Sequence, residues 1–209
     1  MKIVVFGASG KTGFIFVERA LVDGHLVTAF VRSPARMGLQ HRNLTCFQGD
    51  VLDAAAVEQA IAGQEAVISL LGPSHPPAAG MLEMAAKNLV AAMQKTSVRR
   101  LISTTGAGVR DPQDQPKLAD NIMKGWLRLM AGEALRDAEA NVKIIQASDL
   151  DWTIARFPRL VDGDRTGKYQ VGYVDKDSGL RISRADAADF ILNELTAGKY
   201  LRQAPVVSD

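Results

Sequence analysis

Short apolar segments with the composition of strands alternate with helix-like segments along the whole 209-residue chain. The first of them, Ile3-Val4-Val5-Phe6, is rich in β-branched residues and free of charge, as expected of a strand buried on both faces. Strands and helices that take turns predict an α/β fold, a doubly wound parallel sheet with helices on both faces. We expect strands at 2–6, 26–31, 44–48, 66–71, 100–104 and 152–156, and helices at 12–22, 54–62, 81–95, about 118–147 and 185–197.

A glycine-rich stretch, GASGKTG at 7–13, lies between the first predicted strand and the first predicted helix. In this position glycines let the backbone approach a phosphate, and the helix N-terminus offers unpaired N–H groups to the anion. The loop of nucleoside triphosphatases, GxxxxGK[ST], is longer, since only two residues separate Gly7 from Gly10 here. The stretch therefore predicts dinucleotide binding, with an ordinary strand–helix turn as the alternative.

The residues after the second predicted strand indicate which dinucleotide is bound. NAD-binding sheets usually carry an acidic residue there, which binds the adenosine ribose. This chain has Arg32-Ser33-Pro34-Ala35-Arg36 instead, with two guanidinium groups and no carboxylate. Arginine matches a 2′-phosphate well, so the sequence favours NADP, and a solvated basic loop is the alternative.

Composition and length narrow the class of protein further. A net charge of +2 gives no reason to expect nucleic acid as a partner, and no apolar run approaches the length needed to cross a membrane. The chain starts directly with a strand, so we expect a cytoplasmic protein. The single cysteine, Cys46, excludes an internal disulfide, and its place in a predicted strand suggests a buried, inert thiol.

We expect one domain, residues 1–209, in which 157–182 contributes a small lobe on the substrate side. Within it, 168–182 has the pattern of two short strands around a turn, a C-terminal flap over the cofactor. Two loops rich in Gly and Pro, 72–80 and 106–116, each follow a strand and should border the site, because ligands of such sheets bind beyond the carboxyl ends of the strands.

Several segments together resemble one family, the atypical short-chain dehydrogenase/reductases with an NAD(P)-binding Rossmann fold. The resemblance is greatest to the flavin reductase/biliverdin-IXβ reductase type and its NmrA-like bacterial relatives. The matching segments, in chain order, are GASGKTG, VRSPAR, GDVLD, AVISLLG, AAKNLVAAMQK, RLISTTGAG, DLDWTIARFPRL and ISRADAADFIL.

The resemblance assigns roles to individual residues. It implies that the pyrophosphate is held by Gly7, Ser9, Gly10, Thr12 and Gly13, the 2′-phosphate by Arg32 and Arg36, and the adenine by Asp50 and Val51. Lys11, in the same glycine-rich stretch, is a further cofactor-binding candidate. The resemblance places Ser103 and Thr104 beside the nicotinamide ribose, and Pro158 matches a proline of the family after the sixth strand. Independently of the resemblance, we expect Leu70, Leu71 and Gly72, at the end of the fourth predicted strand, to flank the dinucleotide. Thr105 matches the active-site serine of the flavin reductases, and Arg159 stands where those enzymes have a histidine.

The chain departs from the Tyr-x-x-x-Lys pair with which many short-chain dehydrogenases move a proton. Lys143 is preceded four residues earlier by Glu139, and all three tyrosines come later in the chain. Lys143 is either a ligand of the nicotinamide ribose or one half of an ion pair with Glu139 on the helix surface. We expect the loop histidine, His75, to be solvated rather than a proton donor.

A flavin accepts hydride directly and can take its proton from water, so flavin reduction needs no tyrosine. The sequence thus favours an NADPH-dependent reductase of a flavin, quinone or tetrapyrrole-like acceptor, with Thr105, Arg159 and Lys143 as catalytic candidates. The alternative is a non-catalytic redox sensor of the NmrA type that binds NADP. Epimerase or dehydratase action is disfavoured because it needs the tyrosine. The oligomeric state stays open.

Overall fold

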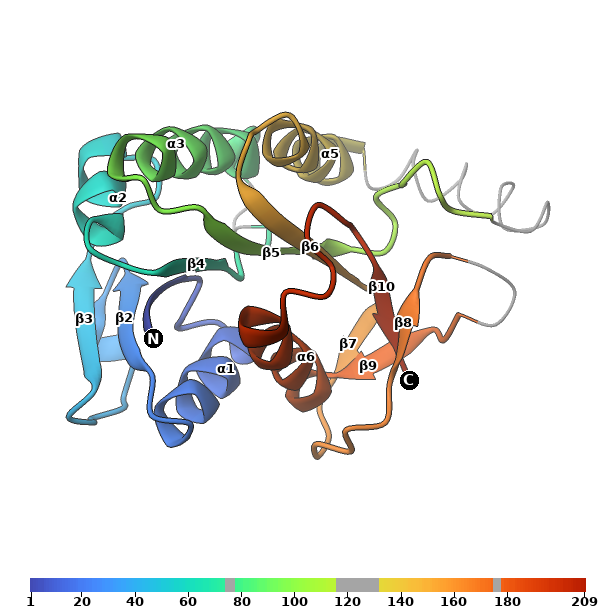
Figure 1. The fold of residues 1–209 in the computed structure, drawn as a ribbon, viewed down its shortest axis with the longest axis horizontal. Coiled ribbons are helices and arrows are strands. Elements are labelled where there is room, and N and C mark those ends of the chain that lie inside the picture. Colours follow the sequence, from blue (N-terminus) through green and yellow to red (C-terminus); the bar gives the residue numbers. More distant parts are fainter. Residues whose placement is uncertain (74–77, 116–131, 175–177) are drawn as a thin grey trace.

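The computed structural model describes residues 1–73, 78–115, 132–174 and 178–209. Its centre is an eight-stranded sheet in the order β3-β2-β1-β4-β5-β6-β10-β8 (Figure 1). The strands are β1 (Lys2–Phe6), β2 (Leu26–Val31), β3 (Leu44–Gln48), β4 (Ala66–Ser69), β5 (Arg100–Gly106), β6 (Asp151–Phe157), β8 (Gln170–Gly172) and β10 (Val206–Ser208). All neighbours pair in parallel except β8, which is antiparallel to β10.

Helices cover both faces of this sheet, as predicted (Figure 1). The helices are α1 (Lys11–Val22), α2 (Ala54–Ile61), α3 (Met81–Thr96), α5 (Gly132–Gln146) and α6 (Arg184–Ala197), with a 3-10 turn, η1, at Pro34–Arg36. One core lies under α1 and α6 and contains Phe16 and Ile191, while the other lies under α2, α3 and α5 and contains Leu89 and Ile145. The α/β, Rossmann-like class is therefore confirmed.

The direction of strand addition reverses at β1. β2 and β3 follow on one side of β1, and β4, β5 and β6 follow on the other. Phe6, the last residue of β1, is paired with Phe30 of β2 and with Ser69 of β4. Ligands of open parallel sheets bind outside the carboxyl ends of the strands at this reversal. The glycine-rich turn occupies that place.

The predicted elements differ from the observed ones mainly near their ends and in the C-terminal part. β4 ends at Ser69 rather than at residue 71, although the Leu70 amide still donates to the Phe6 carbonyl at 2.9 Å. The helix expected over about 118–147 is observed as α5, and its residues 118–131 lie outside the described part of the chain.

The sequence patterns missed three short elements, η1, β7 (Arg159–Val161) and β10. The two short strands expected within 168–182 correspond to β8 and β9 (Arg181–Ser183), but they do not pair with each other. β8 extends the main sheet, whereas β9 forms a separate parallel pair with β7. Strands of three residues carry too little hydrophobic pattern for their partners to be predicted.

One prediction about the surface, the burial of Cys46, is wrong. Cys46 is exposed, because β3 is the edge strand and has a neighbour on one side only.

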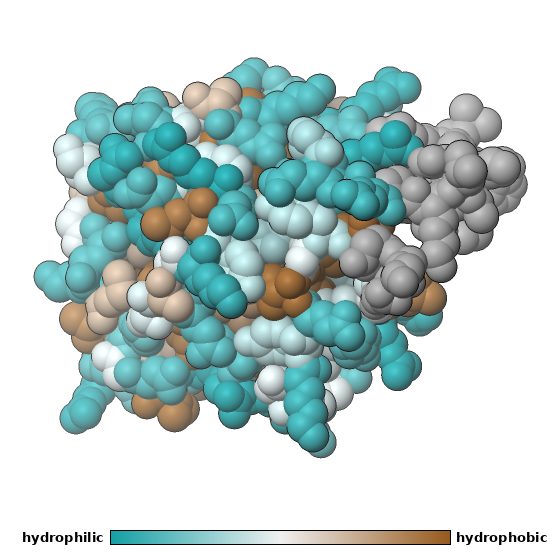
Figure 2. Space-filling view, turned by 45° about the vertical axis from the view of Figure 1, so that its right-hand side comes forward, coloured by the Kyte–Doolittle hydropathy of each residue, from teal (hydrophilic) through white to brown (hydrophobic). Residues whose placement is uncertain are grey.

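Figure 2 shows hydrophilic residues over most of the face that it draws, with hydrophobic residues in small separate groups. Among the described residues, no helix has both the length and the apolar character needed to cross a membrane.

Candidate functional site

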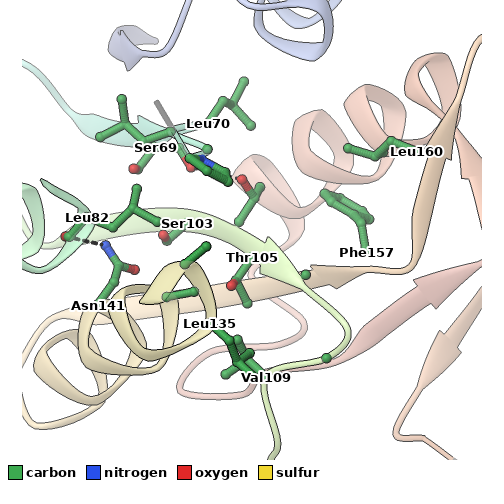
Figure 3. Close-up of a pocket in the computed structure, with 18 of the residues that line it drawn as sticks. Ser69, Leu70, Leu82, Ser103, Thr105, Val109, Leu135, Asn141, Phe157 and Leu160 are labelled. Atoms are coloured by element: carbon green, nitrogen blue, oxygen red, sulfur yellow. Dashed lines mark hydrogen bonds between the residues drawn. The ribbon is translucent and has the colours of Figure 1, made fainter. Parts of the chain in front are cut away.

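A pocket of about 390 Å³ lies at the carboxyl ends of β4, β5 and β6 (Figure 3). This volume is typical of a small-molecule site. The described residues that line it are Thr12, Ser69, Leu70, Leu71, Gly72, Pro73, Leu82, Ser103, Thr104, Thr105, Gly106, Gly108, Val109, Ala134, Leu135, Ala138, Asn141, Phe157, Pro158 and Leu160. Eight of the predicted site residues are among them: Thr12, Leu70, Leu71, Gly72, Ser103, Thr104, Thr105 and Pro158.

The walls of this pocket differ in polarity. Val109, Leu135, Phe157 and Leu160 contribute apolar surface, whereas Ser69, Ser103 and Asn141 bring polar groups and lie near one another in Figure 3. None of the described lining residues has an ionisable side chain. The described lining therefore offers hydrogen-bonding groups and hydrophobic contact, but no acid or base of its own.

The glycine-rich turn has the close backbone approaches that require glycine. Gly7 has φ +80°, and a Cβ on it would lie 2.5 Å from the Leu70 carbonyl oxygen. A Cβ on Gly13 would lie 2.1 Å from the Gly7 carbonyl oxygen. Neither distance is tolerated, so Gly7 is needed for the turn to approach Leu70 just after β4, and Gly13 is needed for α1 to start this close to Gly7.

The N-terminus of α1 is suited to an anion. No side chain caps it, and its first turn holds no acidic residue. Thr12 in that turn lines the pocket, while Ser9 is half-buried and Gly10 and Lys11 are exposed beside it. Free N–H groups, glycines and a positive dipole end fit a pyrophosphate placed here. The residues present therefore fit a bound dinucleotide.

The residues predicted to bind the adenosine half lie on the other side of β1 from the pocket. Arg32 follows β2, and Arg36 ends η1. Both side chains are exposed, and neither makes an ion pair with another described residue. Two exposed guanidinium groups with no ion-pair partner in the described part of the chain are suited to an anionic group.

Asp50 and Val51 lie in the turn after β3. The Asp50 carboxylate accepts a hydrogen bond from the Leu52 amide at 2.9 Å, so it stabilises this turn. Asp53 caps α2, accepting hydrogen bonds from the amides of Ala55 and Ala56. The Val51 carbonyl accepts from the Asn88 side chain at 2.8 Å, which ties the turn to α3.

Two of the three predicted catalytic residues lie outside the pocket. Lys143 is exposed on α5, since it stands two residues beyond Asn141, on the other side of the helix. Arg159 is exposed on β7, where its amide donates to the Leu180 carbonyl, although Pro158 and Leu160 on either side of it line the pocket. Only Thr105 of the three contributes to the lining.

The sequence patterns did not identify several lining residues, above all Asn141. Ala134, Ala138 and Asn141 recur at helical spacing and form the face of α5 that borders the pocket. This face is small and weakly apolar, so hydrophobic periodicity alone does not reveal it. His75, the loop histidine considered from the sequence, lies outside the described residues.

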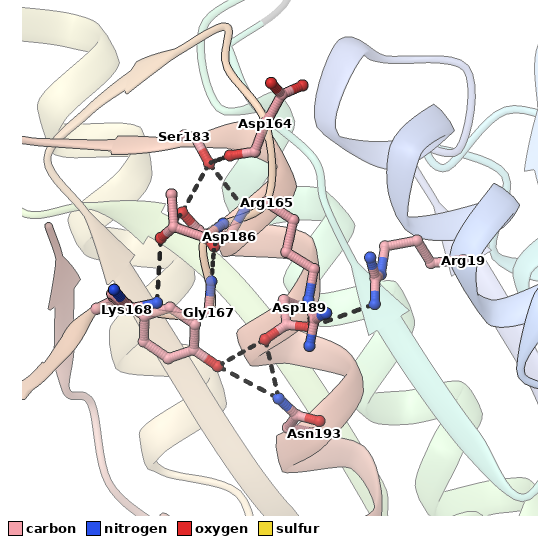
Figure 4. Close-up of polar contacts among 11 residues, drawn as sticks. Arg19, Asp164, Arg165, Gly167, Lys168, Ser183, Asp186, Asp189 and Asn193 are labelled. Atoms are coloured by element: carbon pink, nitrogen blue, oxygen red, sulfur yellow. Dashed lines mark hydrogen bonds and ion pairs between the residues drawn. The ribbon is translucent and has the colours of Figure 1, made fainter.

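The segment that leads away from the pocket is anchored on α6 (Figure 4). Asp186 accepts hydrogen bonds from the backbone amides of Thr166 and Gly167, each at 2.8 Å. Asp189 accepts from Arg19 and Arg165 and from the Tyr169 hydroxyl. Within 157–182, the described residues that line the pocket are Phe157, Pro158 and Leu160, and the expected substrate-side lobe stays a prediction.

The sequence is similar to a family of NAD(P)H-binding proteins and to a protein of matching length. Residues 7–197 match the model of a family described as NAD(P)H-binding. The uncharacterized protein YwnB of Bacillus subtilis is 30% identical over 207 residues, covering 93% of this chain and 92% of that protein.

Two named reductases are also similar. The structure of ChuY, an anaerobillin reductase from Escherichia coli O157:H7, aligns with a TM-score of 0.82 at 25% identity, covering 100% of this chain and 97% of that one. Dihydroflavonol 4-reductase of Hordeum vulgare is 27% identical over 192 residues, 77% of this chain. The chain spans about half the length of that enzyme, 53%.

Proposed function

This chain belongs to the NAD(P)H-binding family, and on that premise we propose that it is an NADPH-dependent oxidoreductase of a flavin or a similar conjugated small molecule. The observation that carries the proposal is the pocket described above. It is joined to the glycine-rich turn at Thr12, is partly apolar, and has no ionisable side chain among its described lining residues.

The proposed preference for NADPH over NADH depends on the residues that follow β2. Arg32 and Arg36 are exposed there without ion-pair partners among the described residues, and no carboxylate follows β2 before η1. A guanidinium group forms strong, charge-assisted hydrogen bonds with the 2′-phosphate of NADPH. NADH has an uncharged 2′-hydroxyl in that place, so it does not gain this interaction. In this proposal the cofactor lies across the carboxyl ends of the strands, with its 2′-phosphate at Arg32, its pyrophosphate at Gly7 and its nicotinamide in the pocket.

Bound NADPH supplies a hydride to the acceptor. The role of this chain is to position both molecules and to exclude water, which the apolar groups Val109, Leu135, Phe157 and Leu160 support. Thr105 offers a hydroxyl at the end of β5, within the lining, as a hydrogen-bond partner for the acceptor. A flavin needs no proton donor from the protein, which agrees with the absence of an acid among the lining residues that the structure describes.

The acceptor class is the finer part of the proposal. The apolar side chains of the lining suit contact with a flat conjugated ring system, and flavins, quinones and tetrapyrroles all have one. The similarity to ChuY, a reductase of anaerobillin, supports including tetrapyrroles. Arg159, exposed between two lining residues, would attract acceptors with a phosphate or carboxylate group.

A second function, a redox sensor that binds NADP without turnover, is supported by the same absence of acid and base groups from the described lining. A steady-state screen separates the two functions. NADPH oxidation is measured with FMN, riboflavin, quinones and linear tetrapyrroles, and NADPH binding is measured in parallel by calorimetry. Turnover of any acceptor supports the reductase, and tight binding without turnover supports the sensor.

A further inference from the structure

Asn141 is the one amide side chain among the described residues that line the pocket, and it is 6% exposed. It lies on α5 and faces the first turn of α3. Its Nδ2 donates a hydrogen bond of 2.9 Å to the backbone carbonyl of Leu82. Figure 3 shows this bond and shows the side-chain oxygen of Asn141 turned towards the cavity.

The orientation of this amide follows from its partner. A backbone carbonyl can only accept, so the NH₂ end of Asn141 must face Leu82 and the oxygen must face the other way. Asp137, one helical turn earlier on α5, accepts from the amides of Leu82 and Glu83 at 2.9 and 2.8 Å. Two side chains of α5 thus fix it against α3, and the Asn141 oxygen is held in place before any ligand binds.

The side-chain oxygen of Asn141 lies in the part of the pocket that the nicotinamide half of a bound dinucleotide would occupy. Ser69 and Ser103, at the ends of β4 and β5, are each 2% exposed and line the same part of the pocket. In the sheet, β4 lies beside β1, and β5 lies beside β4. A dinucleotide whose pyrophosphate lies at Gly7 would therefore extend its nicotinamide half over the ends of β4 and β5, where Ser69 and Ser103 lie. The nicotinamide ribose has two neighbouring hydroxyl groups that require acceptors, whereas the rings of cofactor and acceptor match the apolar walls.

We propose that Asn141 is a cofactor-positioning residue whose Oδ1 accepts a hydrogen bond from a hydroxyl of the nicotinamide ribose. This inference rests on the proposed function, since it requires NADPH in this pocket. It assigns to Asn141 the role that the sequence suggested for Lys143, which lies on the exposed side of the same helix. The ribose then lies at the polar end and the reactive ring at the apolar end.

The test compares binding of two halves of the cofactor to the full chain by calorimetry. Reduced nicotinamide mononucleotide carries the nicotinamide ribose, and adenosine 2′,5′-bisphosphate carries only the adenosine half. In Asn141→Leu we expect the Kd of the mononucleotide and of NADPH to rise about five- to tenfold, as for one lost hydrogen bond. The Kd of adenosine 2′,5′-bisphosphate should change less than twofold.

Two further variants separate binding from structure. Asn141→Asp keeps an acceptor oxygen and loses the donor to Leu82, so it should be less stable yet bind the mononucleotide within about threefold of the wild type. Asp137→Ala weakens the same α3–α5 contact without removing the oxygen, and it should likewise lose stability but not mononucleotide affinity.

The outcomes are distinct for the two proposals. If the wild type binds neither NADPH nor adenosine 2′,5′-bisphosphate, the proposed function fails and the inference fails with it. If the wild type binds both and Asn141→Leu binds the mononucleotide equally well, only the inference is overturned. It is also overturned if Asp137→Ala weakens mononucleotide binding as much as Asn141→Leu does, because Asn141 would then act through the packing of α5.

Discussion

The guanidinium group of Arg156 forms two hydrogen bonds of 2.7 Å with the two carboxylate oxygens of Asp114, and both side chains are buried. Arg156 lies on β6 and also donates to the carbonyls of Val109 and Ala204. Asp114 also accepts from the Val174 amide, just beyond β8. One buried ion pair therefore joins the loop after β5, which lines the pocket, to the C-terminal strands.

Breaking this pair from one side should be costly. In Arg156→Met the Asp114 carboxylate stays buried without its counter-charge, and we expect the free energy of unfolding to fall by about 3–5 kcal/mol. The double variant Arg156→Met/Asp114→Leu should lose less, because no charge is left unpaired. Urea denaturation measures both.

An exposed pair provides the matched control for that experiment. Arg99 and Asp151 have side-chain exposures of 52% and 43%, so Arg99→Met should change stability by less than about 1 kcal/mol. If Arg156→Met and Arg99→Met have equal effects, the buried pair contributes no more than a surface pair and the first expectation is wrong.

The stability of the fold should decrease on the acid side. Burial by itself would raise the pKa of Asp114, but hydrogen bonds from Arg156 and from the amides of Asp111 and Val174 together hold it below the ordinary value of 3.8. The pKa of Asp186 is also lowered: burial opposes this, and hydrogen bonds from Gly167, Thr166 and Ser183 outweigh it. The unfolded chain therefore binds more protons than the folded one as the pH falls below about 4.

The sign of the pH effect follows from these two lowered pKa values. The stabilisation that they give is present above the unfolded-state pKa and is lost as the pH falls through the folded-state pKa. We expect Asp114→Asn/Asp186→Asn to be less stable at pH 7 and to show a shallower loss of stability between pH 4 and 2. Urea titrations at several pH values measure this, and an unchanged slope would contradict it.

The sequence predicted the sheet, its helices and the glycine-rich turn between β1 and α1, because each depends on local patterns such as the β-branched run before Gly7. It also predicted that Thr105 lies in the pocket. It missed Asn141, whose role depends on which face of α5 meets α3, and it could not place Arg159, because β7 pairs with a strand about twenty residues away. Contacts between elements distant in sequence leave no local pattern to interpret.

Two glycines of the turn should respond differently to substitution. Gly10 has φ −75°, which any residue adopts, and its Cβ would lie 3.2 Å from the Gly7 carbonyl oxygen. We expect Gly10→Val to fold but to lose NADPH binding, because its branched side chain would occupy the space proposed for the pyrophosphate. Gly13→Ala should lower the Tm as well, since its Cβ would lie 2.1 Å from the same oxygen. Calorimetry and thermal melts measure the two effects, and normal NADPH binding by Gly10→Val would reduce GASGKTG to a structural turn.

The preference for NADPH over NADH should depend on Arg32 and Arg36. Loss of one charged hydrogen bond to the 2′-phosphate costs about 1.5–3 kcal/mol, so Arg32→Ala should weaken NADPH binding by roughly 10- to 150-fold and leave NADH binding nearly unchanged. Calorimetric titration with both cofactors decides the question. An exposed arginine elsewhere, Arg202, serves as the control, and equal affinity of the wild type for the two cofactors would contradict the assignment.

The proposed reduction of a flavin requires no tyrosine. No tyrosine is among the described residues that line the pocket. The Tyr169 hydroxyl donates to Asp189, the Tyr173 hydroxyl accepts from Gln113, and Tyr200 packs on Phe190. Single replacements of these tyrosines by Phe should change kcat less than about tenfold, below the usual contribution of a general acid, 10²–10⁴.

Residues in or beside the pocket should matter more than any tyrosine. Thr105→Val should lower kcat, because it removes a hydroxyl from the lining. Arg159→Met should raise KM for FMN, whose phosphate it would no longer attract, and much less for riboflavin, which has no phosphate. Steady-state kinetics with this pair of acceptors isolates the charge, since the flavin ring is the same in both. If KM rises equally for FMN and riboflavin, Arg159 does not act through the phosphate, and if a tyrosine variant loses more than a hundredfold in kcat, the reaction uses a protein acid that the described pocket does not contain.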